Sequence, residues 1–283
     1  MEIILSKTNQ DFINQYGEFL NLYPERTQLL MINVNKDIDT PLLKNQFRGA
    51  VMNQGEIVLV FLNAIPYNLQ LFSIKHSEEA IHMIIEYLIE NLIEIRGVQG
   101  NKRNTDVFIK KYSFLTYLHF KCRLQMDIMR LNHLVEVPLK GFFRLADLHD
   151  VNPLIEIEKA FFEEALHETQ PICQIYERVR NQLSSNQIYV LTDDDDQIFS
   201  TAMVSRTLYK GRAISLVYTY PKYRNQGYSR SLLYQLCSIL FQQGYEFVTL
   251  FVDKTNPVSN RVYLKLGFEV VEDNYDYVID KVA

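Results

Sequence analysis

The sequence predicts an α/β protein of the α+β kind, with two halves that each hold a mixed twisted sheet flanked by helices. The observations behind this are strand-like runs alternating with helix-like runs, and an order of elements that occurs twice along the chain. In the second half the order is three strands, a helix, a strand, a helix and a final strand. We therefore expect two domains, residues 1–137 and 138–283, joined through the segment VEVPLKG at 135–141.

The second half gives the clearer pattern. Short apolar or alternating runs at 187–192, 197–207 and 213–219 are separated by turn sequences, which predicts three strands. From Tyr228 to Gln243 the leucines recur with helical spacing, and Gly244 supplies a stop. The remaining expected elements are a strand at 141–145, a helix at 155–167, a buried strand at 246–252, a capped helix ending at Gly267 and a last strand at 268–280.

The first half repeats this outline in a weaker form. The expected strands lie at 47–53, 56–65, 68–74 and 122–131, and the expected helices at 78–95 and 104–114. Because no identical motif recurs, a structural duplication is a hypothesis here.

Composition excludes several classes of function. The net charge is −5 and neither half has a basic excess, which argues against a nucleic-acid partner. The N-terminus lacks the pattern of a signal peptide, and no apolar run approaches the roughly 18 residues of a membrane span, so we expect no membrane partner and a cytoplasmic location. The three cysteines form no CxxC pair and the six histidines no HExxH motif, so we expect no metal site. The sequence does not indicate an oligomeric state.

The stretch YPKYRNQGYS at 220–229 lies between an expected strand and an expected helix. Backbone N–H groups at a helix N-terminus point outward, and the helix dipole there favours an anion. Gly227 lets a ligand approach the backbone closely, Arg224 adds a planar cation, and Ser229 is too small to cover the amides. The turn suits a pyrophosphate, although it is neither a Walker loop nor a dinucleotide fingerprint.

Two motifs carry a resemblance to a known family. RNQGYS at 224–229 resembles the R/Q-x-x-G-x-G/A loop of the GCN5-related N-acetyltransferase (GNAT) superfamily, and NPVSNRVYLKLGF at 256–268 resembles its second signature. The whole chain is similar to bacterial members that place a degenerate acetyltransferase-like domain before the active one. Ser229 stands where glycine or alanine is commoner. The strand at 213–219 has no glutamate where many members keep a general base, so the base stays open.

The resemblance implies an N-acetyltransferase that moves an acetyl group from acetyl-CoA, its co-substrate, to an amine of an unidentified acceptor. In the family the pantetheine arm pairs with the strand before the loop, the loop amides hold the pyrophosphate, an asparagine side chain contacts the arm, and many members use a tyrosine as general acid. The matching positions here are, for the cofactor, Val217, Tyr218, Thr219, Arg224, Asn225, Gln226, Gly227, Tyr228, Ser229 and Asn256, and for catalysis Tyr263.

Two other functions compete with this one. A non-catalytic acyl-CoA-binding regulator would keep the loop at 224–229 and be indifferent to Tyr263. An aminoacyl-tRNA-dependent transferase is disfavoured by the intact loop and by the absence of a basic surface.

Several residues also have a purely structural interpretation. Asn256 can be the cap of its helix, Tyr263 a core aromatic, and the acidic run 193–196 a solvated hairpin tip. Glu163 and Glu164 are candidates for binding the amine or for the base, against the alternative of an exposed helix face. GVQGNKR at 97–103 borders the cleft or is a simple turn, and Cys237 is expected in the core.

Overall fold

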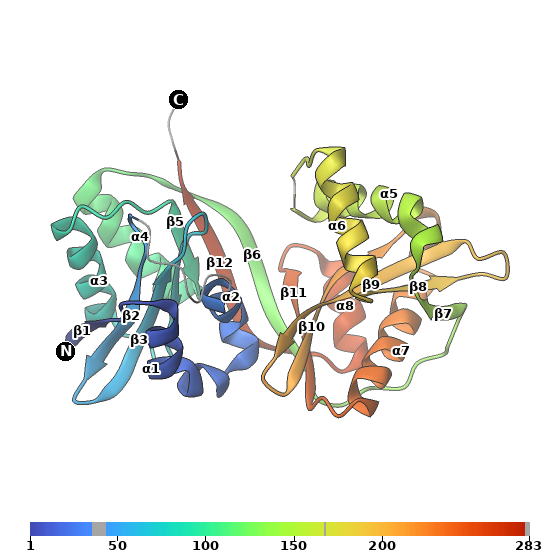
Figure 1. Cartoon of the computed structure of the whole chain (residues 1–283), viewed down its shortest axis with the longest axis horizontal. Coiled ribbons are helices and arrows are strands. Elements are labelled where there is room, and N and C mark those ends of the chain that lie inside the picture. Colours follow the sequence, from blue (N-terminus) through green and yellow to red (C-terminus); the bar gives the residue numbers. More distant parts are fainter. Residues whose placement is uncertain (36–43, 167, 281–283) are drawn as a thin grey trace. The chain divides into compact units, whose positions relative to one another are not determined.

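The computed structural model describes residues 1–35, 44–166 and 168–280. Contacts divide the chain into two compact units, each of them a sheet with helices (Figure 1). The first unit combines Met1–Ile128 with Val271–Ala283, and the second is Met129–Val270. This division assigns most of the last strand to the first unit, whereas the sequence-based division keeps 138–283 together. The division into 1–137 and 138–283 therefore stays a prediction.

The first unit contains a mixed sheet in the strand order β1-β2-β3-β4-β5-β12. Neighbouring strands are antiparallel except β4 and β5, which are parallel. Its elements are β1 (Glu2–Leu5), α1 (Asn9–Asn21), α2 (Pro24–Asn35), β2 (Phe47–Asn53), β3 (Glu56–Asn63), β4 (Leu69–Phe72), α3 (Glu78–Glu90), β5 (Gly97–Gly100), α4 (Lys102–Thr116), β6 (Phe120–Leu131) and β12 (Glu269–Ile279). β6 and β12 each cross a boundary of the two units.

Helices cover both faces of this sheet because successive strand side chains point to opposite sides. On β3, Phe61 belongs to the apolar cluster that includes α3 and α4. Its neighbours Val60 and Leu62 belong to the cluster formed with α1 and α2. The unit therefore has two cores, one on each face of the sheet.

The second unit contains a sheet in the order β11-β10-β9-β8-β7. β10 and β11 are parallel, and the pairs β9–β10, β8–β9 and β7–β8 are antiparallel. Its elements are β7 (Phe142–Leu145), η1 (Leu148–Asp150), α5 (Val151–Phe161), the π-helical turn η2 (Phe162–Leu166), α6 (Ile172–Ser184), β8 (Ile188–Thr192), β9 (Ile198–Leu208), β10 (Gly211–Thr219), η3 (Pro221–Tyr223), α7 (Tyr228–Gln242), β11 (Phe247–Asp253) and α8 (Pro257–Leu266).

Two helix pairs cover the faces of the second sheet (Figure 1). On β8, Ile188 and Val190 pack in the cluster with α5 and α6, whereas Leu191 packs in the cluster with α7 and α8. α7 contributes Leu232, Leu233, Leu236, Cys237 and Leu240 to that second cluster. The expected amphipathic helix is thus present, and its apolar stripe faces the sheet.

The structure confirms the expected α/β fold with a mixed sheet flanked by helices. The main local differences are at helix ends. The helix expected over 78–95 ends at Glu90, where Leu92 takes a left-handed conformation with φ of 51°. The helix expected over 155–167 changes to a π-helical turn after Phe161.

Among the described strands and α-helices, five were not foreseen: β1, α1, α2, β5 and α6. In α6 the buried residues Ile175, Val179 and Leu183 are separated by polar residues, so its apolar face is narrow. None of the described helices has the length and apolar character that spanning a bilayer requires.

Candidate active site

The turn from β10 to α7 presents an uncovered helix N-terminus. The chain leaves β10 at Thr219, passes through η3 and enters α7 at Tyr228. Gly227 is the N-cap residue and has a φ of 87°, a left-handed conformation that favours glycine. No side chain of the described residues caps this helix. Around a Cβ position on Gly227 the nearest side-chain atom is Arg230 Nη2, at 3.6 Å, so the space beside this glycine is open.

Arg224 is tied back to the end of β10. Its Nε donates to the carbonyl oxygen of Thr219 at 3.0 Å, and its Nη2 donates to Glu164 Oε2 at 2.8 Å. The guanidinium carbon lies 5.3 Å from the centre of the Tyr218 ring. The positive charge of Arg224 is therefore compensated by a carboxylate in this structure.

Glu164 also binds Tyr218. The Tyr218 hydroxyl donates to Glu164 Oε1 at 2.9 Å. Burial, reinforced by the Glu164 carboxylate, raises the pKa of Tyr218 to about 12. Glu163 instead lies 4.0 Å from Lys159 on an exposed helix face. Of the two glutamates weighed from the sequence, the structure brings only Glu164 to the loop.

The end of β10 leaves the parallel ladder. Pairing with β11 runs from Gly211–Phe247 to Ile214–Leu250, whereas β10 continues to Thr219. A bulge at this point, with Leu216 at a φ of 49°, shifts the register against β9. Bulges re-aim the backbone, and a strand edge beyond its ladder can accept another extended chain.

The three β10 residues predicted to contact the cofactor lie in this last part of the strand. Tyr218 is buried, and Val217 and Thr219 are half-buried. The Ser200 hydroxyl on β9 donates to the Tyr218 carbonyl at 2.9 Å and bonds to the Thr219 hydroxyl at 2.8 Å. These bonds hold the strand end to β9.

Asn256 is the N-cap of α8, where its side chain accepts a hydrogen bond from the Ser259 N–H at 3.0 Å. The structural interpretation of this residue is therefore correct. Because the residue is exposed, its contact with a cofactor stays a prediction.

Tyr263 is a residue of α8, and its side chain lies in the core that α7 and α8 form with the sheet. Its side chain is 6% exposed, and its ring meets Phe268 edge-on with centroids 5.8 Å apart. Among the described residues, none is hydrogen-bonded to its hydroxyl. Burial raises the pKa of the phenol above its ordinary value, so the Tyr263 hydroxyl keeps its proton at neutral pH.

Lys140 is the loop contact that the sequence analysis missed. Its ammonium donates to the Gln226 carbonyl at 2.6 Å and lies 5.7 Å from the Tyr228 ring centre. The only signal was one cation in a segment taken as a linker, and no local pattern connects it to a turn more than eighty residues away.

The other residues weighed from the sequence have structural roles. Asp193 closes the tip of the acidic hairpin by accepting from the N–H groups of Asp195 and Gln197, and Asp196 pairs with Arg144. Cys237 is fully buried, which raises the pKa of its thiol. The interpretation of 97–103 as a simple turn is wrong, because this segment forms β5 and the start of α4 in the first unit. No group of three or more His, Cys, Asp or Glu in the described parts of the chain could hold a metal ion.

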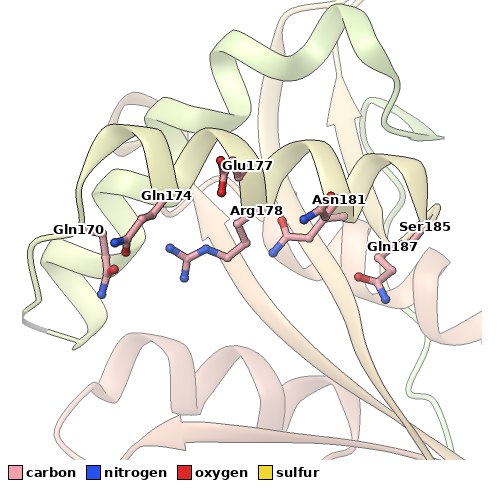
Figure 2. Close-up of a pocket in the computed structure, with 8 residues that line it drawn as sticks. Gln170, Gln174, Glu177, Arg178, Asn181, Ser185 and Gln187 are labelled. Atoms are coloured by element: carbon pink, nitrogen blue, oxygen red, sulfur yellow. The ribbon is translucent and has the colours of Figure 1, made fainter. Parts of the chain in front are cut away.

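A polar groove runs along one face of α6, separate from the loop (Figure 2). Figure 2 shows side chains from one end of the helix to the other along this face, and no residue predicted for the active site lines it. It is lined by Gln170, Gln174, Glu177, Arg178, Asn181, Gln182, Ser185 and Gln187.

Arg178 of this groove pairs with a buried acid on α5. Its Nε lies 2.7 Å from Glu158 Oε1, and the Glu158 side chain is 2% exposed. Burial raises the pKa of Glu158 to about 7, and the attraction of Arg178 only partly opposes this.

Fold and loop together define an α/β protein in which a helix N-terminus without a side-chain cap follows a strand end. Residues 151–268 match the family model described as Acetyltransferase (GNAT) family. A comparison with curated protein sequences found no match.

Solved structures share the fold over nearly the whole chain. An acetyltransferase of the GNAT family from Colwellia psychrerythraea has a TM-score of 0.60 at 10% identity, with 99% of this chain and 100% of that chain covered. A GCN5-related N-acetyltransferase from Sphaerobacter thermophilus has a TM-score of 0.58 at 14% identity, with 92% and 91% covered. A tandem GNAT protein from the clavulanic acid biosynthesis pathway has a TM-score of 0.55 at 11% identity, with 99% and 98% covered. The chain therefore has the two-domain GNAT fold.

Glu158 predicts a pH dependence of stability. Its pKa in the folded protein, about 7, lies above the ordinary value of 4.5, so the folded state binds more protons between these values. The free energy of unfolding should fall as pH rises from about 4.5 to about 7, by on the order of 2 kcal/mol. Glu158→Gln should lose most of this decrease, as measured by urea unfolding at pH 5 and pH 8.

The matched control is Glu177→Gln, because Glu177 lies on the same groove but is exposed. This variant should keep the pH dependence of the wild type. An equal pH dependence in wild type and Glu158→Gln would contradict the assignment.

Proposed function

We propose that the protein is an N-acetyltransferase that moves an acetyl group from acetyl-CoA to an amine. The observation that carries this proposal is the N-terminus of α7 at Gly227, which has open space beside it and no side-chain cap. It follows the end of β10 that is not paired with β11, and both lie in the segment that matches the GNAT family model. An anionic group fits there because the amides and the helix dipole both favour negative charge.

The donor is proposed to bind in two parts. The amides of the loop 224–229 hold the pyrophosphate, with close approach at Gly227. The pantetheine arm lies along Val217, Tyr218 and Thr219 in the manner of an added strand, since β10 passes beyond its ladder with β11 there. Asn256 is proposed to contact the arm with the amide nitrogen that its capping bond leaves available.

The transfer needs three contributions from the chain. The amine nitrogen forms a bond to the thioester carbonyl carbon, and a backbone N–H of the β10 end stabilises the oxyanion that develops there. Tyr263 then donates its phenolic proton to the sulfur as the carbon–sulfur bond breaks. The proton of the attacking amine leaves to a base that stays unassigned. A cytoplasmic location stays a prediction.

A non-catalytic acyl-CoA-binding protein is the second candidate. The burial of Tyr263 favours it, because a phenol in a packed core has limited access to a reacting sulfur. The third experiment below separates the two functions.

The first prediction is that acetyl-CoA stabilises the protein. A ligand that binds only the folded state at 100 times its Kd adds about 2.7 kcal/mol of stability. A rise in melting temperature with acetyl-CoA, confirmed by calorimetry, is expected. No change at millimolar acetyl-CoA would exclude the proposed function in both forms.

The second prediction concerns Gly227→Val. A branched side chain there fills the open space and strains the left-handed backbone, so the Kd for CoA should rise at least about tenfold. Gly244→Val is the matched control, because Gly244 follows the other end of α7 with a φ of 91° and has nothing within 4 Å of its Cβ position. That control should lose stability but keep CoA affinity, and equal affinities for both variants would remove the loop from the donor site.

The third prediction concerns Tyr263→Phe. Removing the hydroxyl should leave the packing and CoA affinity nearly intact, since no described residue bonds to it, while kcat falls about 10² to 10⁴ fold. Release of free CoA thiol in a panel of amine acceptors measures kcat, with Tyr234→Phe, in the same core, as the control. Turnover within about threefold of wild type would show that Tyr263 is not the general acid.

A further inference from the structure

The cationic side chains around the loop differ in the groups that they already contact. Arg224 is ion-paired with Glu164 at 2.8 Å, so its charge is largely compensated. The contacts of the Lys140 ammonium in the described parts of the chain are the Gln226 carbonyl and the Tyr228 ring, and none is a carboxylate. Arg230, whose Nη2 lies near Gly227, belongs to the loop and helix motif itself. Lys140 is therefore an uncompensated cation brought to the loop from outside that motif.

The position of Lys140 is built into the fold. Its backbone N–H donates to the Ser231 hydroxyl at 2.8 Å, and the same hydroxyl donates to the Lys140 carbonyl at 2.9 Å. Ser231 lies on the first turn of α7 and is fully buried, so both of these bonds are shielded from water. The backbone of residue 140 is thus attached directly to the helix whose N-terminus is the proposed anion site.

The next residue is a glycine in a left-handed conformation, and β7 begins directly after it. Gly141 has a φ of 67°, and a Cβ there would lie 2.7 Å from the Thr192 carbonyl oxygen, so glycine is required. With the backbone held at Ser231, the Lys140 side chain reaches the loop through its bond to the Gln226 carbonyl. A lysine placed this way can keep its bond to Gln226 with one N–H and use its other two for a ligand.

We infer that Lys140 binds a phosphate group of the donor nucleotide. The inference rests on the proposed function, because it needs an acyl-CoA at the loop. The ligand chemistry is a phosphate oxygen, which CoA offers both in its diphosphate and in its 3′-phosphate. In this arrangement Lys140 supplies charge to the phosphate, while Arg224 remains attached to β10 and Glu164.

The experiment is isothermal titration of the full chain with CoA and with dephospho-CoA, which lacks the 3′-phosphate. Lys140→Gln should raise the Kd for CoA about tenfold, the effect of losing one charge-assisted hydrogen bond, and Lys140→Arg should keep most of the affinity. The loss should shrink at high salt, because screening weakens the missing interaction in the wild type.

The second ligand identifies the phosphate. If Lys140 binds the diphosphate, Lys140→Gln weakens CoA and dephospho-CoA by the same factor. If it binds the 3′-phosphate, wild type and Lys140→Gln have the same Kd for dephospho-CoA. Either result supports the inference.

Lys222→Gln is the matched control for charge. Lys222 belongs to the preceding turn, and its ammonium lies 3.5 Å from Gln197 Oε1 and 4.6 Å from the Tyr223 ring centre. It should change the Kd less than twofold, with melting temperatures reporting that each variant is folded.

Two outcomes overturn the inference while leaving the proposed function intact. One is a Kd for CoA in Lys140→Gln that lies within about twofold of the wild-type Kd, with the wild type binding CoA. The other is an equal loss in Lys140→Gln and Lys222→Gln, which would reflect net charge alone. Failure of the wild type itself to bind CoA would instead overturn the proposed function, and this inference with it.

Discussion

The parallel pairing of β10 with β11 is the constraint on which the site depends. Two parallel neighbours cannot be joined by a tight turn, so the chain must cross over one face of the sheet and return to the other end. α7 is that crossover, and its N-terminus consequently lies at the carboxyl end of β10. Topology therefore brings together a strand end, a helix N-terminus and the turn between them, whatever side chains these elements carry.

Side chains then adjust the electrostatics of this junction. Both side chains of the Arg224–Glu164 ion pair are exposed. Such pairs contribute little to stability because water and salt screen them. Its effect is on orientation: the guanidinium is held along β10 by Thr219 and Glu164 and is not directed freely at the loop. The protein carries a net negative charge, so the attraction of the proposed phosphorylated donor depends on where uncompensated cations such as Lys140 stand.

The sequence predicted the features that depend on local pattern. α7, β11 and the loop with its glycine follow from periodicity and from the rarity of glycine in this chain, which has ten in all. The contacts of Glu164 and Lys140 could not be predicted, because each joins residues about sixty or more positions apart through the packing of separate elements. α6 was missed because its narrow buried face gives a weak periodic signal. The assignment of most of β12 to the first unit has a related cause, since strand periodicity indicates that a strand exists but not which sheet it joins.

The membership of β12 in the first unit bears on how the chain is synthesised. β12 pairs antiparallel with β5, from Tyr275–Gly100 to Val278–Gly97, so the sheet of the first unit needs residues that the ribosome adds after the whole segment 151–268. Domains usually fold in the order in which they emerge, and long-range strand pairing is slow. Here one edge of β5 stays unpaired while about 170 further residues are synthesised. A chaperone or a neighbouring nascent chain can bind this exposed strand edge before β12 does.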